Sequence, residues 1–240
     1  MTGTSAPSPK VRIFADGADL DGVRALAANP VICGFTTNPT LMRKAGISDY
    51  QAFARDMLAI VGERSVSFEV FADDFAEIER QARIIAGWGS NVYVKIPITN
   101  TKGESAAPTI RRLSDAGVKL NVTAILTVAQ VRRTVEALNA EVPAIISVFA
   151  GRIADTGRDP VPVMAQCRQE MASRPKAELL WASTRELYNI FQAEVSGCDI
   201  ITATPDILGK LGGVGRDLDE LSLDTVKMFY RDALSAGYQL

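Results

Sequence analysis

The chain has 240 residues, of which 47% are hydrophobic and 22% are charged, and its formal net charge is −2. This balance is typical of a globular protein of one large or two small domains, and it argues against a basic surface that binds nucleic acid or anionic lipid. The chain contains no histidine, which excludes every catalytic or metal site that needs an imidazole. Acid–base chemistry must therefore come from Asp, Glu, Lys, Tyr or water.

The first residues, 1–10, are rich in Ser, Thr, Pro and Gly and lack the apolar segment of a signal peptide. We expect a flexible leader there, followed by one domain over 11–240. No uninterrupted apolar run approaches the ~20 residues of a membrane-spanning helix, so no membrane partner is expected. Cys33, Cys167 and Cys198 lack CxxC spacing, and we interpret them as reduced core thiols of a cytoplasmic protein.

Short runs rich in β-branched residues alternate with amphipathic stretches along the chain. The runs predict strands at 11–15, 31–35, 66–71, 92–97, 118–123, 143–149, 178–182 and 198–202. The amphipathic stretches predict helices at 50–62, 74–87, 105–116, 127–139, 160–173 and 185–196, and a terminal helix at about 219–236.

Eight strands that alternate with helices in a chain of this length predict a single (β/α)8 TIM barrel, which typically needs ~250 residues. A doubly wound sheet is the alternative, but it more often has five to seven strands. The terminal helix follows the last barrel unit, and we expect it to pack against the barrel mouth or a neighbouring subunit. Residues 211–216 look like a phosphate-binding glycine loop, but they lack its GK[ST] ending and follow a helix, which favours a connector.

Polar residues gather where the predicted strands end. Strands of a parallel barrel are almost continuously hydrophobic, and barrel active sites lie at the carboxyl ends of the strands. In chain order these residues are Asp16, Thr36, Thr37, Asn38, Glu69, Lys95, Asn121, Thr123, Ser147, Arg152, Ser183 and Arg185, with Phe149 on the same face as Ser147. Several have structural alternatives: Asp16 as a helix N-cap, Asn38 as an Asx turn, and residues 183–186 as a capping box. Their common location favours one active site.

Lys95 is the most informative of these residues, because its run, 91–98, otherwise predicts a buried strand. Burying an ammonium group is costly unless the group is paired or deprotonated, and a desolvated lysine is the usual nucleophile for a Schiff base with a carbonyl substrate. The alternative is a structural lysine that is paired with a carboxylate or extends along the strand end to water.

The neighbouring groups suit a phosphorylated sugar. Glu69 and Asp16 can move protons, and Asn38 and Asn121 can bind hydroxyl groups. A late cluster near the sixth and seventh strands, where barrels often bind phosphate, consists of Arg152, Ser183 and Arg185. Lysine and carboxylate chemistry of this kind requires no metal or other cofactor.

Five segments resemble transaldolases: Thr36-Thr37-Asn38-Pro39, Val94-Lys95-Ile96-Pro97, Leu120-Asn121-Val122-Thr123, Phe149-Ala150-Gly151-Arg152-Ile153 and Ala182-Ser183-Thr184-Arg185. The resemblance implies a (β/α)8 barrel with Lys95 as the Schiff-base lysine and Asp16 as the acid–base carboxylate. It also implies that Glu69 and Thr123 hold the catalytic water. The implied dihydroxyacetone contacts are Asn38, Asn121 and Ser147, with Thr36 and Phe149 beside them, and the implied phosphate site is Arg152, Ser183 and Arg185.

Within this superfamily the transferases carry Glu and Phe where the fructose-6-phosphate aldolases carry Gln and Tyr. Glu69 and Phe149 therefore imply a transferase that moves a dihydroxyacetone unit from a ketose phosphate to an aldose phosphate. The alternatives are an aldolase-like lyase, a transferase that uses a pentose phosphate to give an eight-carbon ketose phosphate, and a catalytically silent sugar-phosphate sensor. Thr184 and the loop 154–158 depart from the pattern of the long transaldolases. A homo-oligomer is expected, because family members form assemblies of various sizes.

Overall fold

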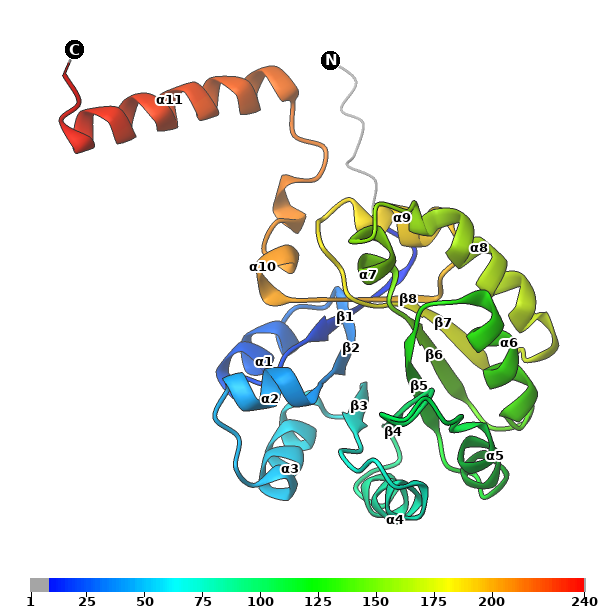
Figure 1. The fold of residues 1–240 in the computed structure, drawn as a ribbon. Helices are drawn as coiled ribbons and strands as arrows, with labels where there is room; N and C mark the ends of the chain where they lie inside the picture. Colours follow the sequence, from blue (N-terminus) through cyan, green and yellow to red (C-terminus); the bar gives the residue numbers. More distant parts are fainter. Residues whose placement is uncertain (1–8, 240) are drawn as a thin grey trace. The chain divides into compact units, whose positions relative to one another are not determined.

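The computed structural model describes residues 9–239, and its centre is a closed barrel of eight parallel strands in the order of the sequence (Figure 1). The strands are β1 (Arg12–Asp16), β2 (Ile32–Thr36), β3 (Ser65–Glu69), β4 (Val92–Pro97), β5 (Leu120–Ile125), β6 (Ala144–Val148), β7 (Ala177–Trp181) and β8 (Ile200–Ala203). The predicted TIM barrel is confirmed, and the doubly wound alternative is wrong. Eight residues of the predicted leader, 1–8, lie outside the described residues.

Helices follow the strands around the outside of the barrel (Figure 1). They are α1 (Leu20–Ala27), α2 (Pro39–Lys44), α3 (Tyr50–Val61), α4 (Phe75–Ala86), α5 (Ala107–Asp115), α6 (Val128–Ala137), α7 (Ala150–Ala154), α8 (Pro160–Glu170) with the 3-10 turn η1 (Met171–Ser173), α9 (Asn189–Val195) and α10 (Pro205–Leu208). The predicted helical segments correspond to α3, α4, α5, α6, α8 and α9. No helix was predicted for α1, α2, α7 and α10, because segments of four to eight residues are too short to establish a helical period.

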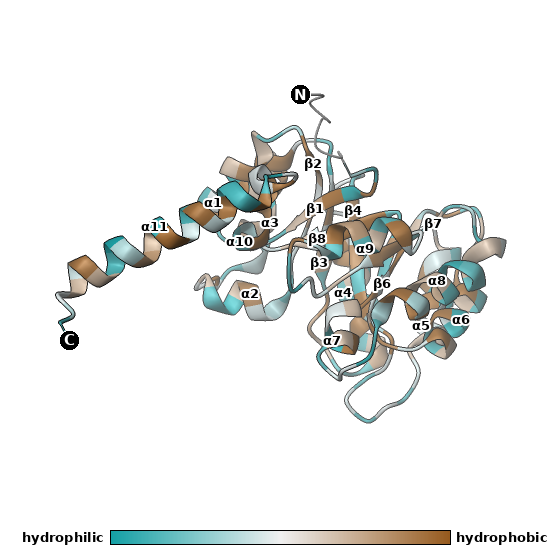
Figure 2. Ribbon diagram, turned by 90° about the horizontal axis from the view of Figure 1, so that it is seen from above, coloured by the Kyte–Doolittle hydropathy of each residue, from teal (hydrophilic) through white to brown (hydrophobic). Residues whose placement is uncertain are grey.

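The described chain divides into two compact units, residues 9–208 and the residues from Gly209 onward. The second unit contains a 3-10 turn, η2 (Leu211–Gly213), within the predicted connector, and the helix α11 (Leu218–Ala236), which confirms the predicted terminal helix. None of the residues of α11 is buried, and apolar and polar residues alternate along it (Figure 2). Among residues 9–239, no helix combines the length and the apolar character that crossing a membrane requires.

Layers of side chains fill the barrel interior, because alternate residues of each strand point inward. One layer is an apolar cluster that includes Phe14, Tyr93, Ile145, Leu180 and Ile200. The inward-pointing residues two positions further along most of these strands are polar, and they lie at the carboxyl ends; they are Asp16, Lys95, Ser147 and Thr202. The apolar layer thus forms the base on which a polar cavity is built.

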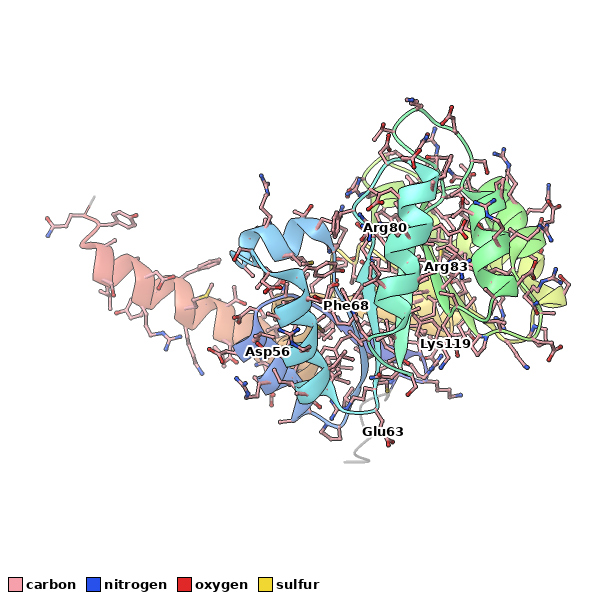
Figure 3. The ribbon with its side chains drawn as sticks, turned by 90° about the horizontal axis from the view of Figure 1, so that it is seen from below. Asp56, Glu63, Phe68, Arg80, Arg83 and Lys119 are labelled. Atoms are coloured by element: carbon pink, nitrogen blue, oxygen red, sulfur yellow. The ribbon has the colours of Figure 1, made fainter. Side chains whose placement is uncertain are left out.

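On the outer side of the barrel wall, Phe68 of β3 makes T-shaped contacts with aromatic residues of α3 and of the turn after α4. Its ring centroid lies 5.4 Å from that of Trp88 and 6.2 Å from that of Tyr50. Figure 3 shows Phe68 beside these helices and Arg80 and Arg83 along α4. The two arginines form exposed ion pairs within α4, so this helix is polar outside and apolar toward the barrel.

The cysteine prediction is only partly right. Cys167 and Cys198 are buried free thiols, and burial raises the pKa of the Cys167 thiol to about 11. Cys33 is exposed, because it lies on the outward face of β2, so its assignment to the core is wrong.

Gly34 allows the apolar layer to close. A Cβ atom at this position would lie 2.6 Å from Cζ of Phe14 and 2.7 Å from both of its Cε atoms. Phe14 is itself fully buried, so its ring has no space into which it can move.

We predict that Gly34→Ala lowers the free energy of unfolding by about 1–3 kcal/mol, because it overpacks a rigid part of the core. Urea unfolding measures this change. Gly212→Ala is the matched control, since a Cβ atom there meets nothing within 4 Å. The double variant Gly34→Ala/Phe14→Leu should recover part of the loss. An unchanged midpoint for Gly34→Ala would contradict the proposed close packing.

Candidate active site

A cavity of about 510 Å³ opens at the carboxyl ends of the strands. Of the twelve residues to which the transaldolase resemblance gives a role, ten line it: Asp16, Thr36, Asn38, Glu69, Lys95, Thr123, Ser147, Phe149, Arg152 and Ser183. Asn121 and Arg185 are not among the lining residues. The structure therefore gathers most of the predicted set into one site, as the common location at strand ends predicts.

Lys95 lies in the barrel interior with both an ion-pair partner and a hydrogen-bond acceptor. Its Nζ lies 3.0 Å from Oε2 of Glu69 and donates a hydrogen bond of 2.8 Å to the carbonyl oxygen of Thr37. The Lys95 and Glu69 side chains are only 9% and 14% exposed. Pairing with a carboxylate, one of the structural alternatives, is thus present, and it stabilises an ammonium group that also borders the cavity.

Asp16 is the last residue of β1 and also lines the cavity. Thr36 donates a hydrogen bond of 2.8 Å to its Oδ1. Burial raises the pKa of the Asp16 carboxyl above its ordinary value, while Lys95 and the hydrogen bond from Thr36 oppose that rise. The N-cap alternative is wrong, because Asp19 caps α1 by accepting a 2.9 Å hydrogen bond from the backbone N–H of Gly22.

Asn38 has a structural function in addition to its place in the cavity. Its Oδ1 accepts a hydrogen bond of 3.0 Å from the backbone N–H of Leu41 and so caps α2, with Pro39 in the first turn. The preceding residue, Thr37, donates a hydrogen bond of 2.9 Å from its Oγ1 to the carbonyl oxygen of Ser67. This bond fixes the peptide whose carbonyl accepts the hydrogen bond from Lys95.

Asn121 lies below the cavity surface and supports it. Its Nδ2 donates to Oγ of Ser67 at 3.0 Å, and its Oδ1 accepts a 2.6 Å hydrogen bond from Oγ of Ser147. These buried bonds connect β3, β5 and β6. Ser147 is thereby held at the cavity wall with its hydroxyl proton already donated.

Thr123 presents a buried hydroxyl group that bonds no other described residue, so it can bind water or substrate. The next residue, Ala124, has φ 60°, where the pairing of β5 with β6 is interrupted. Ser183 has φ 65°. These two are the non-glycine residues with positive φ within the described part of the chain, and both line the cavity. Strained backbone of this kind is common at functional sites.

The predicted phosphate cluster is divided. Arg152 and Ser183 line the cavity, and the Arg152 guanidinium carbon lies 5.2 Å from the centre of the Phe149 ring. Arg185 instead binds Asp155, with Nη2 2.6 Å from Oδ2 and Nε 3.0 Å from Oδ1. Its guanidinium group is therefore neutralised by a residue of the loop that departs from the long transaldolases.

The loop from Ser183 onward is held by hydrogen bonds to Asn189 and by close packing against Gly151 rather than by a capping box. Asn189 Oδ1 accepts hydrogen bonds from the backbone N–H groups of Arg185 and Glu186. A Cβ atom on Gly151 would lie 1.6 Å from the carbonyl oxygen of Ser183, so only glycine permits this contact between α7 and the loop. The capping-box alternative is wrong.

Thr202, Leu180 and Ala182 also line the cavity, although they were not predicted from the sequence. Thr202 lies in β8 and is the last residue of the predicted strand 198–202. The rule that selects polar residues at strand ends therefore applies to it as well. Leu180 and Ala182 are apolar, and no chemical signal separates them from other core residues.

The chain is similar to known proteins over most of its length. Residues 13–239 match the family described as Transaldolase/Fructose-6-phosphate aldolase. A "Probable transaldolase" of Dehalococcoides mccartyi is 35% identical over 203 residues, which cover 82% of this chain and 88% of that protein. A "Probable transaldolase" of Lactiplantibacillus plantarum is 33% identical, with coverage of 84% and 88%.

Among solved structures, that of KGPDC from Streptococcus mutans has a TM-score of 0.54 and 11% identity, with 82% of this chain and 88% of that chain covered. At this identity the likeness concerns the barrel fold alone. The family match spans nearly the whole chain, and the two relatives share about a third of the aligned residues with it. The chain belongs to the transaldolase/fructose-6-phosphate aldolase family.

Proposed function

We propose that the protein transfers a dihydroxyacetone unit from a ketose phosphate to an aldose phosphate through an imine on Lys95. The observation that carries this proposal is the position of Lys95, with its Nζ 3.0 Å from Glu69 in a cavity that Asp16 also lines. An amine nucleophile needs a proton acceptor, and cleavage of the C–C bond needs a second one. The cavity supplies both.

In the first step the Lys95 amine attacks the substrate carbonyl after its extra proton passes to the Glu69 carboxylate. The carbinolamine then loses water to form the imine. Asp16 removes the proton from the hydroxyl group beside the bond that breaks, the aldehyde leaves, and the electron pair of the bond moves into the imine to give an enamine. An acceptor aldehyde reverses these steps, and water held by Glu69 and Thr123 finally hydrolyses the new imine.

The hydrogen-bonding groups around the cavity support the binding of a polyhydroxylated substrate. Asn38 and Ser147 line the cavity near Lys95, with Asn121 behind Ser147. Thr36 and Phe149 complete this part of the proposed substrate site. Arg152 and Ser183 would bind the phosphate, and Arg185 would contribute through the N–H donors that Asp155 does not use.

We further propose a cytoplasmic homo-oligomer. The three free thiols support a reducing compartment. Exposed apolar side chains on α11, including Val226 and Phe229, support contacts with another copy of the chain. Light scattering of the purified protein should give a mass above 25.8 kDa, and a monomer would contradict this proposal.

The proposed reaction is tested with fructose 6-phosphate as donor and aldose phosphates of three to five carbons as acceptors. A transferase should form a new ketose phosphate at a rate far above that of free dihydroxyacetone release. EDTA should leave the rate unchanged, because the imine accepts the electron pair. Rapid release without an acceptor would instead indicate an aldolase, and no turnover of any donor would indicate a sensor. An eight-carbon product would identify a pentose phosphate acceptor.

Phe149→Tyr should shift the enzyme from transfer toward release. The variant adds one hydroxyl group at nearly constant volume to a ring that lines the cavity, and this group can bring water or a proton to the enamine. We expect a higher ratio of free dihydroxyacetone to transfer product, measured in one reaction by chromatography. Phe149→Leu is the matched control without a hydroxyl group. An unchanged ratio in folded Phe149→Tyr would mean that residue 149 does not face the intermediate.

Arg152→Ala should lower kcat/KM for a phosphorylated acceptor about 10- to 100-fold, the loss of a charge-assisted contact of about 1.5–3 kcal/mol. Arg185→Ala should cost less, because Asp155 already neutralises that guanidinium. Arg158→Ala is the control, since Arg158 is exposed and bonds Thr156 outside the cavity. Equal losses with phosphorylated and unphosphorylated acceptors would show that Arg152 is structural.

A further inference from the structure

Thr202, to which no function has been assigned above, lies next to the group that anchors Asp16. Its side chain is buried, and its Oγ1 lies 2.6 Å from Oγ1 of Thr36. The Thr36 Oγ1 in turn lies 2.8 Å from Oδ1 of Asp16. Asp16 ends β1, and the two threonines belong to β2 and β8, the strands on either side of it. The carboxylate thus bonds Thr36 on one neighbouring strand, and Thr202 on the other neighbouring strand bonds Thr36.

The hydrogen positions in this chain follow from counting protons. A carboxylate only accepts, so Thr36 must donate its single hydroxyl proton to Asp16. The hydroxyl of Thr36 then has no proton left for Thr202, and Thr202 must donate to it. The result is a directed pair of donors, from Thr202 to Thr36 to Oδ1 of Asp16, in which each bond polarises the next.

The backbone around Thr202 is fixed as well. Thr184 donates a hydrogen bond of 2.7 Å to the carbonyl oxygen of Thr202, so the loop after β7 secures the end of β8. Within residues 9–239, the bond from Thr36 is the one hydrogen bond that the Asp16 side chain accepts. Oδ2 therefore remains available to a substrate hydroxyl in the cavity.

Other charged groups also act on the Asp16 carboxylate, and their influence must be distinguished from that of the Thr202–Thr36 hydrogen bonds. Lys95 on β4 stabilises the carboxylate, while burial and Glu69 on β3 destabilise it. Arg152 lines the same cavity. Asp19 before α1, Lys44 on α2 and Asp206 on α10 line an adjoining cavity with Asp16. None of these groups is altered by a change at residue 202.

We propose that Thr202 is a positioning residue that orients and polarises Thr36, and thereby holds Asp16 ionised with Oδ2 directed to the substrate. This inference rests on the proposed function, in which Asp16 takes the proton of the substrate hydroxyl. When Oδ2 receives that proton, Oδ1 still accepts the bond from Thr36. The donor pair therefore keeps the carboxyl in one orientation through both protonation states.

Thr202→Val removes the hydroxyl at constant shape, and Thr202→Ser keeps it. Without the donor pair the buried carboxylate is less stable, so Asp16 should bind its proton at higher pH. The acid limb of the kcat/KM profile should then move up by about half to one pH unit, which is a loss of about 3- to 10-fold at any pH on that limb. Thr202→Ser should resemble the wild type. Thr134→Val is the control, since Thr134 is a buried threonine on α6 outside both cavities.

A second readout does not depend on turnover. The carboxyl carbon of Asp16, identified by its loss in Asp16→Asn, can be titrated by 13C NMR, and its pKa should be higher in Thr202→Val than in the wild type. Equal titration in the two proteins would overturn the inference even if the wild type is active. A wild type without transfer activity would overturn the proposed function instead, and the NMR comparison would still decide about Thr202. If Thr202→Val does not fold, Thr202→Ala compared with Thr202→Ser gives the same test.

Discussion

The site depends on one buried ion pair. An ammonium group inside a barrel needs a carboxylate and a hydrogen-bond acceptor, and Lys95 finds them in Glu69 and in the carbonyl of Thr37. Glu69 and Lys95 are direct partners in the register of β3 and β4. A slip of one residue in either strand would turn one of them outward and leave the other charge buried alone. The ion pair that stabilises the buried Lys95 therefore also fixes the register of β3 and β4 at the centre of the cavity.

The rest of the cavity wall consists of polar side chains that are hydrogen-bonded to one another, and it lies on the apolar layer of the barrel interior. Phe14 against Gly34 closes the apolar layer below, and the bonds of Asn121 to Ser67 and Ser147 hold three strands together beside it. Such a network is rigid because each member has its partner. Two groups that border the cavity keep spare hydrogen-bonding capacity, Oγ1 of Thr123 and Oδ2 of Asp16.

The strands and most of the site could be predicted from the sequence, because short β-branched runs define strands and polar residues at their ends violate that pattern. Lys95 in β4 is the clearest example. Contacts between distant segments could not be predicted: nothing in the sequence indicates that Asp155 binds Arg185 or that the carbonyl of Thr37 accepts from Lys95. The exposure of Cys33 was also missed, since a residue in a predicted barrel strand carries no sign of whether a helix covers its outer face.

Covalent trapping tests the central role of Lys95 most directly. The protein is treated with borohydride in the presence of fructose 6-phosphate, which reduces an imine to a stable amine, and the modified residue is mapped by mass spectrometry. We expect irreversible loss of activity and a single dihydroxyacetone-derived adduct on Lys95, with neither in the absence of the sugar phosphate. An adduct on another lysine, or full activity after treatment, would contradict this role.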